Sequence, residues 1–76
     1  MLTGKMFKLK RQILAVTLNN EPRKADFVPE GAIIEVLGGP RQDDKRLVDI
    51  RWENADYAVF FVDLEERGEE IRSAGA

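Results

Sequence analysis

Apolar and polar residues alternate most regularly in residues 47–52. Val48, Ile50 and Trp52 fall on one side of an extended chain, and two charged residues fall between them on the other side. Side chains of a strand point alternately to its two faces, so this spacing is typical of a strand with one buried face. The pattern therefore predicts a half-buried β-strand.

A second strand is predicted over residues 57–62, after a short turn at residues 53–56. The two strands are expected to form a symmetric antiparallel hairpin, in which facing side chains pack against each other. Three pairs then share the core face: Trp52 with Tyr57, Ile50 with Val59, and Val48 with Phe61. These six side chains form the centre of the predicted core.

The opposite face of this hairpin is unusually apolar. In the same register Phe60 lies across from Asp49, and Leu47 lies across from Val62. An aromatic ring on an outer face is either covered by another segment of the chain or belongs to a contact surface. The residues Phe60, Leu47 and Val62 are therefore the candidate interaction surface, with self-association as one of its uses.

The N-terminal part predicts one long strand over residues 6–18. Phe7 and Leu9 are apolar at odd positions, whereas Leu14 begins an apolar series at even positions. A regular strand cannot place both series on one face, so a bulge or sharp bend is expected near residues 10–13. The result would be a long, curled first strand.

Turn-forming residues mark the boundaries of the remaining elements. Residues 28–31 match a type I turn, which would open a strand over residues 32–37 that ends at the breaker in residues 38–40. Residues 41–46 are all charged or amide residues, as expected of a solvated loop. Residues 63–68 predict one helical or 3₁₀ turn, with Asp63 as the N-cap and Gly68 as the terminator. A short last strand and a flexible tail at residues 73–76 would follow.

This order of elements resembles an SH3-like small barrel. Three sequence features carry the resemblance: residues 29–36 match PxGxxxxV, residues 48–52 resemble VDVxW, and residues 59–68 resemble VxFxxDLxxRG with one residue fewer between the Phe and the Asp, a set found in short bacterial proteins of this fold. The resemblance implies an all-β fold, namely a five-stranded barrel with one 3₁₀ or helical turn before the last strand. It implies no activity.

Composition narrows the chemistry. The chain has 76 residues and contains no His and no Cys, which removes imidazole bases, thiolate nucleophiles and Cys/His zinc sites. A chain of this size forms a single domain over residues 1–76, with a core at about 5–72, and has little room for an enclosed substrate cavity. No enzymatic activity, metal or cofactor is expected. No apolar run is long enough to span a bilayer and no secretory signal is recognisable, so no membrane contact and a cytoplasmic location are expected.

Charge is distributed unevenly along a chain with 12 basic and 14 acidic residues. Residues 1–24 are basic and residues 63–76 are acidic, so we expect the two segments to pair in the fold. The basic residues also suggest an alternative partner, because small barrels bind nucleic acid through charge and stacking. The candidate basic patch consists of Lys8, Lys10, Arg11, Arg23 and Lys24.

Three hypotheses for function remain. The favoured one is a non-catalytic interaction module that binds an unknown protein partner or a second copy of itself as a homodimer. Nucleic-acid binding through the basic patch is the alternative. An enzyme would require an oligomer that encloses a shared cavity lined by Tyr57, Asp49 or Glu35. Proline-rich peptides are not the expected ligand, because the aromatic groove motif of signalling SH3 domains is absent from this sequence.

Overall fold

The computed structural model describes residues 3–18 and 22–71, and in this part of the chain seven strands and one short helix are found. Because the strands greatly outnumber the single seven-residue helix, the all-β prediction is confirmed. All strand pairs are antiparallel. The elements are β1 (Met6–Leu9), β2 (Ile13–Thr17), β3 (Ala25–Val28), β4 (Ile33–Gly38), β5 (Leu47–Trp52), β6 (Ala55–Phe60), α1 (Phe61–Arg67) and β7 (Gly68–Ile71).

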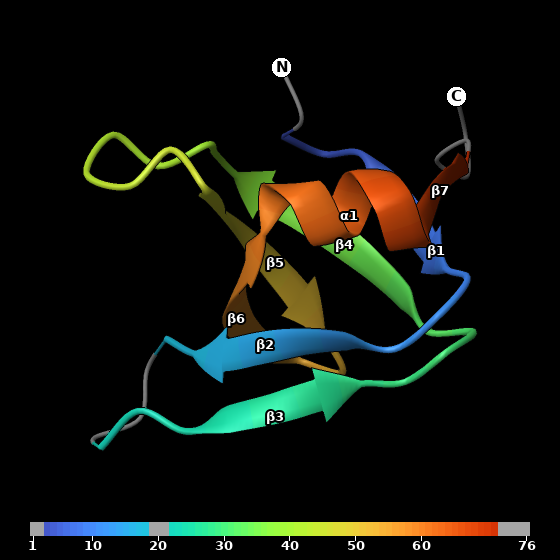
Figure 1. Ribbon diagram of the computed structural model, residues 1–76, viewed down its shortest axis with the longest axis horizontal. Helices are drawn as coiled ribbons and strands as arrows, with labels where there is room; N and C mark the ends of the chain where they lie inside the picture. The colour runs from blue at the N-terminus through green and yellow to red at the C-terminus, as the bar shows by residue number, and fades with distance from the viewer. Residues whose placement is uncertain (1–2, 19–21, 72–76) are drawn as a thin grey trace.

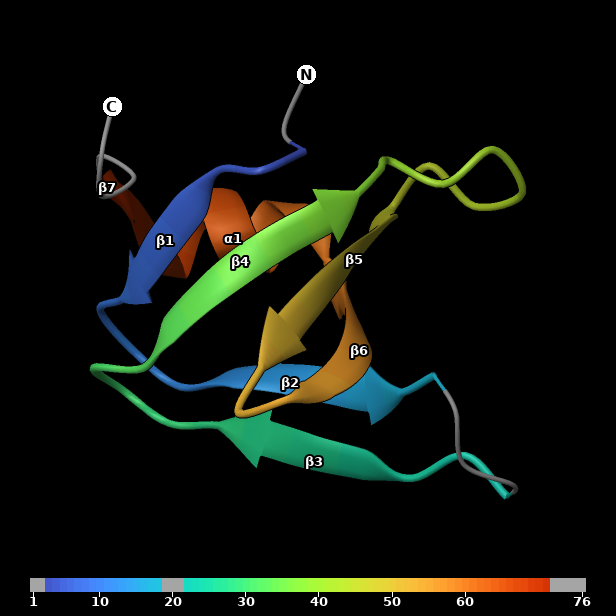
Figure 2. The same ribbon diagram turned by 180° about the vertical axis from the view of Figure 1, so that it is seen from behind.

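The strands form a single open sheet in the order β3-β2-β6-β5-β4-β1-β7. Its two edges are therefore β3 and β7. Figures 1 and 2 show the sheet strongly bent, with the β2–β3 hairpin running obliquely to β4 and β5. The first and last strands lie side by side at the other end of the sheet, next to α1.

The core lies on the concave face of this bent sheet. Val48, Ile50 and Val59 are almost completely buried, as the alternation predicted, and Leu64 of α1 joins them from the helix. The other fully buried side chains come from β1 to β4, which supply Leu9, Ile13, Ala15, Val28, Ile34 and Val36. Four partly buried residues pack around this cluster, namely Ala32, Trp52, Tyr57 and Phe61.

The strand count differs from the five predicted. The expected long first strand is interrupted at residues 10–12 and forms two strands, β1 and β2, which pair with different neighbours. The interruption lies where the apolar positions change parity, so the predicted bend is confirmed. The additional strand β3 was not predicted, because three of its four residues are exposed and they show no alternation.

The β5–β6 hairpin keeps the predicted faces but has a different register. Ile50 pairs with Tyr57 and Val48 pairs with Val59, so the pairing is displaced by two residues from the symmetric hairpin. The cause is a tighter turn: Glu53 and Asn54 both have positive φ, of 51° and 65°. Two consecutive residues in this conformation are typical of a type I′ turn, which connects strands with only two residues.

The turn before β4 also lies one residue later than predicted. The amide of Ala32 donates to the carbonyl of Pro29 at 3.2 Å, which places Gly31 third in the turn. Gly31 has a φ of 86°. A positive φ at the third position is characteristic of a type II turn, where glycine avoids a steric penalty, so the turn is not the predicted type I.

Helix α1 begins earlier than predicted, since its N-cap is Phe60 and not Asp63. Asp63 lies within the first turn, where its negative charge interacts favourably with the positive end of the helix dipole. Gly68 ends the helix, as predicted, and its amide donates to the carbonyl of Leu64. At seven residues α1 is far from long and apolar enough to span a bilayer, and the described ranges contain no other helix. The predicted tail at residues 73–76 lies outside the described residues.

The two oppositely charged ends of the chain meet, as their charges predicted. Strand β1 pairs with β7 in a register that places Lys8 opposite Glu69. Next to this pair, Lys5 Nζ lies 3.5 Å from Glu70 Oε1. Both groups of this second pair are substantially exposed, so water and salt screen their attraction and its contribution to stability is modest.

Candidate interaction surface

The three apolar residues predicted on the outer face remain accessible in the fold. Leu47 and Phe60 are direct cross-strand partners, although the sequence had placed Asp49 opposite Phe60. Phe60 is 37% exposed and Leu47 is half-buried. Val62 is more exposed, at 54%, but it lies in the first turn of α1 and not opposite Leu47.

Phe60 and Leu47 belong to a longer series that crosses four strands. The β2–β6 ladder ends where Ala15 pairs with Val59, and Leu14 and Phe60 are the next residues of the two strands beyond that pair, on the same face of the sheet. Leu14 in turn pairs with Phe27 of β3. We call this series, which consists of Leu47, Phe60, Leu14 and Phe27, the apolar row.

The apolar row ends at the edge of the sheet, at Phe27. This residue is 55% exposed, the largest value among the large hydrophobic side chains of the described residues. Its position was not recognised in the sequence, because it depends on pairing between β2, β3 and β6, which are distant in the chain. Alternation in residues 14–18 was the one available signal, since it marks Leu14 as a strand residue with an apolar face.

A second row of smaller side chains lies beside the apolar row. Asp49 pairs with Ala58, Ala58 pairs with Val16, and Val16 pairs with Ala25. Ala58 is 5% exposed, so the sheet is densely packed even on this outer face. The two rows together form a mainly apolar surface over β6, β2 and β3.

A charged loop, residues 39–46, borders the apolar row at Leu47. Arg41 reaches Asp49 through Nη1 at 3.4 Å and Asp43 through Nε at 3.4 Å. The carbonyl of Arg46 accepts a hydrogen bond from the amide of Phe61 at 2.7 Å. These contacts attach the loop to the start of β5 and to the start of α1, so the polar boundary of the row is fixed in position.

The five basic residues proposed as one patch lie in separate places. Lys10 and Arg11 lie between β1 and β2, beyond the Ile13 end of β2. Arg23 and Lys24 lie beyond its other end, before β3, as Lys24 pairs closely with Thr17. The five residues of β2 separate the two pairs by about 17 Å. Lys8 is on β1 opposite Glu69, so the structure does not gather the five charges on one surface.

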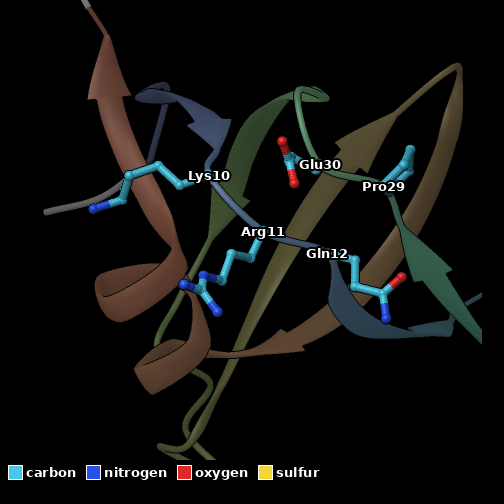
Figure 3. A pocket seen from close by; sticks show the side chains of 5 residues that line it. All are labelled: Lys10, Arg11, Gln12, Pro29 and Glu30. Carbon is cyan, nitrogen blue, oxygen red and sulfur yellow. The ribbon is translucent and has the colours of Figure 1, made fainter.

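An open pocket of about 480 Å³ lies at the corner between β1 and β2. Figure 3 shows Lys10 and Arg11 extending to one side of this pocket and Gln12 to the other, with Glu30 among them; Pro29 completes the lining. The carbonyl of Gln12 accepts a hydrogen bond from Arg67 Nη1 at 3.1 Å. The pocket is polar and open, and Glu30 opposes the attraction of its two bases for an anion.

The carboxylates and the tyrosine considered for catalysis are not brought together. Glu35 and Asp49 belong to the outer face of the sheet, whereas Tyr57 points to the core and lies near Trp52, with ring centroids 6.2 Å apart. On the outer face Arg51 Nε contacts Asp56 Oδ1 at 3.0 Å, and this hydrogen bond raises the pKa of Arg51. Arg51 of β5 and Asp56 of β6 therefore pair with each other across the sheet.

No protein-family model, no curated protein and no solved structure matches this chain. The positions of its own side chains are therefore the basis for a functional proposal. The apolar row combines two exposed phenyl rings with two half-buried leucines on one face of the sheet.

Proposed function

We propose that this protein is a non-catalytic interaction module that binds an apolar segment of a partner protein through the apolar row. The observation that supports the proposal is the placement of Leu47, Phe60, Leu14 and Phe27 on one face of four neighbouring strands, with Leu47 paired to Phe60 and Leu14 paired to Phe27. Aromatic residues that remain accessible in a mainly apolar surface are typical of protein contact sites.

The dimensions of the row suit a short segment of protein. Neighbouring strands lie about 4.8 Å apart, so four strands give a row of about 14 Å. An extended segment of four or five residues, or about two and a half turns of an amphipathic helix, covers this length. Burial of the two rings would supply most of the binding energy, because large aromatic side chains dominate the energetics of such contacts.

We also propose that the fold is an SH3-like small barrel. Support comes from the order of its elements: a hairpin follows the first strand, a helical turn precedes the last strand, and the last strand pairs with the first. The sheet is open between its edges β3 and β7. In such a fold the function resides on the outer surface, since the interior is filled by side chains.

The chemistry of the row favours binding over catalysis. Its four side chains are hydrocarbon or phenyl groups, which exclude water from a contact but cannot transfer a proton or act as nucleophiles. Two charged groups at the Leu47 end of the row, on Arg41 and Asp49, are engaged with each other at 3.4 Å. They are placed to orient a partner at the boundary of the row.

Selection of random peptides displayed on phage tests this proposal directly. We expect the wild-type protein to enrich peptides with aromatic or large aliphatic residues. A synthetic copy of an enriched peptide should bind at least about tenfold more weakly to Phe60→Asp, because the substitution places an unpaired charge in the contact. Isothermal titration calorimetry measures the difference.

Ile33→Asp is the matched control. Ile33 is 50% exposed, nearly as much as Phe27, but it belongs to β4 and lies outside the apolar row. This variant should bind the peptide as the wild type does. Failure to enrich any peptide, or equal losses in Phe60→Asp and Ile33→Asp, would contradict the proposal.

A further inference from the structure

Strand β3 has one edge that no other strand of the sheet covers. Strand β3 is the last strand on its side, and both ribbon views show no other element beyond it (Figures 1 and 2). Ala25, Asp26 and Phe27 are all exposed. An exposed edge of this kind is able to pair with a strand of another chain.

Hydrogen bonds show which residues of β3 face outward. The amide of Thr17 donates to the carbonyl of Lys24 at 2.9 Å, so Lys24 directs its backbone toward β2. Directions alternate along an antiparallel strand, and Ala25 and Phe27 therefore direct theirs away from β2. The outward amide of Phe27 donates to Oδ1 of Asp26 at 2.8 Å. In the single chain this bond occupies one hydrogen-bond donor of the β3 edge.

The sequence of the edge is complementary to itself in one register. A symmetric antiparallel pair centred on Ala25 places Lys24 of each copy opposite Asp26 of the other. Centring on Lys24 or on Asp26 places like charges opposite each other, which is unfavourable. Centring on Phe27 places Ala25 opposite Pro29, which has no amide to donate.

We infer that two copies of this chain associate through their β3 strands, with Ala25 facing Ala25 and Lys24 facing Asp26 of the second copy. Because Lys24 and Asp26 are at non-hydrogen-bonded positions of the new pair, their side chains approach closely. Phe27 then lies opposite Arg23 of the second copy, where a guanidinium can rest on the ring. The carboxylate of Asp26 exchanges the amide of Phe27 for the ammonium of Lys24.

This pairing extends the sheet without changing its faces. The small row that ends at Ala25 continues directly into the same row of the second copy. The two apolar rows then lie on one face, displaced by four residues along the strand, or about 13 Å. A dimer of this kind would bind a partner at two apolar rows. This two-site binding rests on the proposed function, whereas the β3 dimer does not depend on it.

The interface is small, and breaking the bond between Asp26 and Phe27 opposes its formation. We therefore expect a dimer that forms as the protein concentration rises, and not a permanent one. Pro22 and Pro29 flank β3 and have no amide to donate. They therefore limit the pairing of two β3 strands to the short segment between them.

Disulfide trapping tests the register, because the natural chain contains no cysteine. Facing hydrogen-bonded residues have Cα atoms about 5.5 Å apart, a distance that a disulfide spans. Ala25→Cys should therefore form a covalent dimer under mild oxidation at least about tenfold faster than Gln42→Cys. Gln42 is an exposed residue of the 39–46 loop and is the matched control.

Charge exchange provides a second measurement that does not depend on the cysteine variants. Lys24→Asp and Asp26→Lys should each lower the association constant about tenfold in sedimentation equilibrium, and the double exchange should restore it. Equal rates of disulfide formation at both cysteine positions, or a double exchange no better than either single variant, would overturn the inference.

The two proposals can fail independently. Phe60→Asp should leave the β3 dimer unchanged, because Phe60 lies two strands from the edge. Lys24→Asp should leave peptide binding to a single apolar row unchanged. Loss of dimerisation in Phe60→Asp, but not in the charge variants, would place self-association on the apolar row and reject the β3 pairing.

Discussion

The carboxylate of Asp44 is held by one neighbouring residue. Arg46 donates to it from its backbone amide at 3.1 Å and from two guanidinium nitrogens at 3.0 Å each. Hydrogen bonds to the charged form of a carboxyl group favour that form. The side-chain bond from Arg46, followed by its backbone bond, lowers the pKa of Asp44 from 3.8 to about 2.

This interaction predicts a local effect of acid on the 39–46 loop. The pKa of Asp44 is lower in the folded chain, so its carboxylate stabilises the fold above about pH 4 and loses this contribution as the pH falls toward 2. In Arg46→Gln the pKa should rise toward 3.8, although the backbone bond remains. An NMR titration of the Asp44 carboxyl carbon measures this pKa. Lys45→Gln is the control, because it removes a base that is not bonded to Asp44 and should leave the pKa of Asp44 unchanged.

The hairpin of β5 and β6 shows what a local pattern determines at the scale of elements. Alternation in residues 47–52 correctly predicted which side chains face the core, since parity follows directly from the sequence. The register was wrong by two residues because it depends on the turn. Glu53 is not a typical residue for positive φ, so the sequence did not indicate a two-residue turn.

The same turn leads to a stability prediction. Asn-Gly is the preferred pair for a type I′ turn, because both residues adopt positive φ at little cost. The double substitution Glu53→Asn with Asn54→Gly should stabilise the protein by about 0.5–1.5 kcal/mol, as measured by urea denaturation. Glu53→Val should destabilise it, since a β-branched residue resists positive φ. If the double substitution destabilised the protein, the turn would not be of this type.

The candidate surface was only partly predictable for a related reason. Phe60 and Leu47 were identified because the alternation along the two strands of one hairpin places both on the outer face, although the predicted register did not pair them. Leu14 and Phe27 were not identified, because their neighbours are set by pairing between segments far apart in the chain. Strand β3 itself lacked the alternation that marks a half-buried strand, since its edge position leaves both faces largely exposed.

At the scale of the whole molecule, the sheet is completed by contacts between the two ends of the chain. Strand β1 lies between β4 and β7, and its residues Phe7 and Leu9 contribute to the core. Opposite charges face each other across the β1–β7 pair, as the charge distribution predicted. Lys5 and Lys8 of the basic first segment therefore lie against Glu70 and Glu69 of the acidic last segment.

This pairing predicts a charge-exchange effect. Lys8→Glu places two like charges opposite each other in β1 and β7 and should destabilise the protein. Lys8→Glu combined with Glu69→Lys restores opposite charges in the same register and should recover stability. The coupling energy should be about 0.2–1 kcal/mol in a double-mutant cycle measured by chemical denaturation at low salt. A cycle without coupling would mean that the two side chains do not interact.

The position of β1 also has a consequence during synthesis of the protein. Its neighbour β4 is made before β7, and β7, which pairs Ile71 with Met6, begins more than sixty residues after the start of β1. One edge of β1 therefore stays open until β7 has been made. A chain that stops before residue 68 lacks β7 and leaves this edge of β1 exposed to other chains.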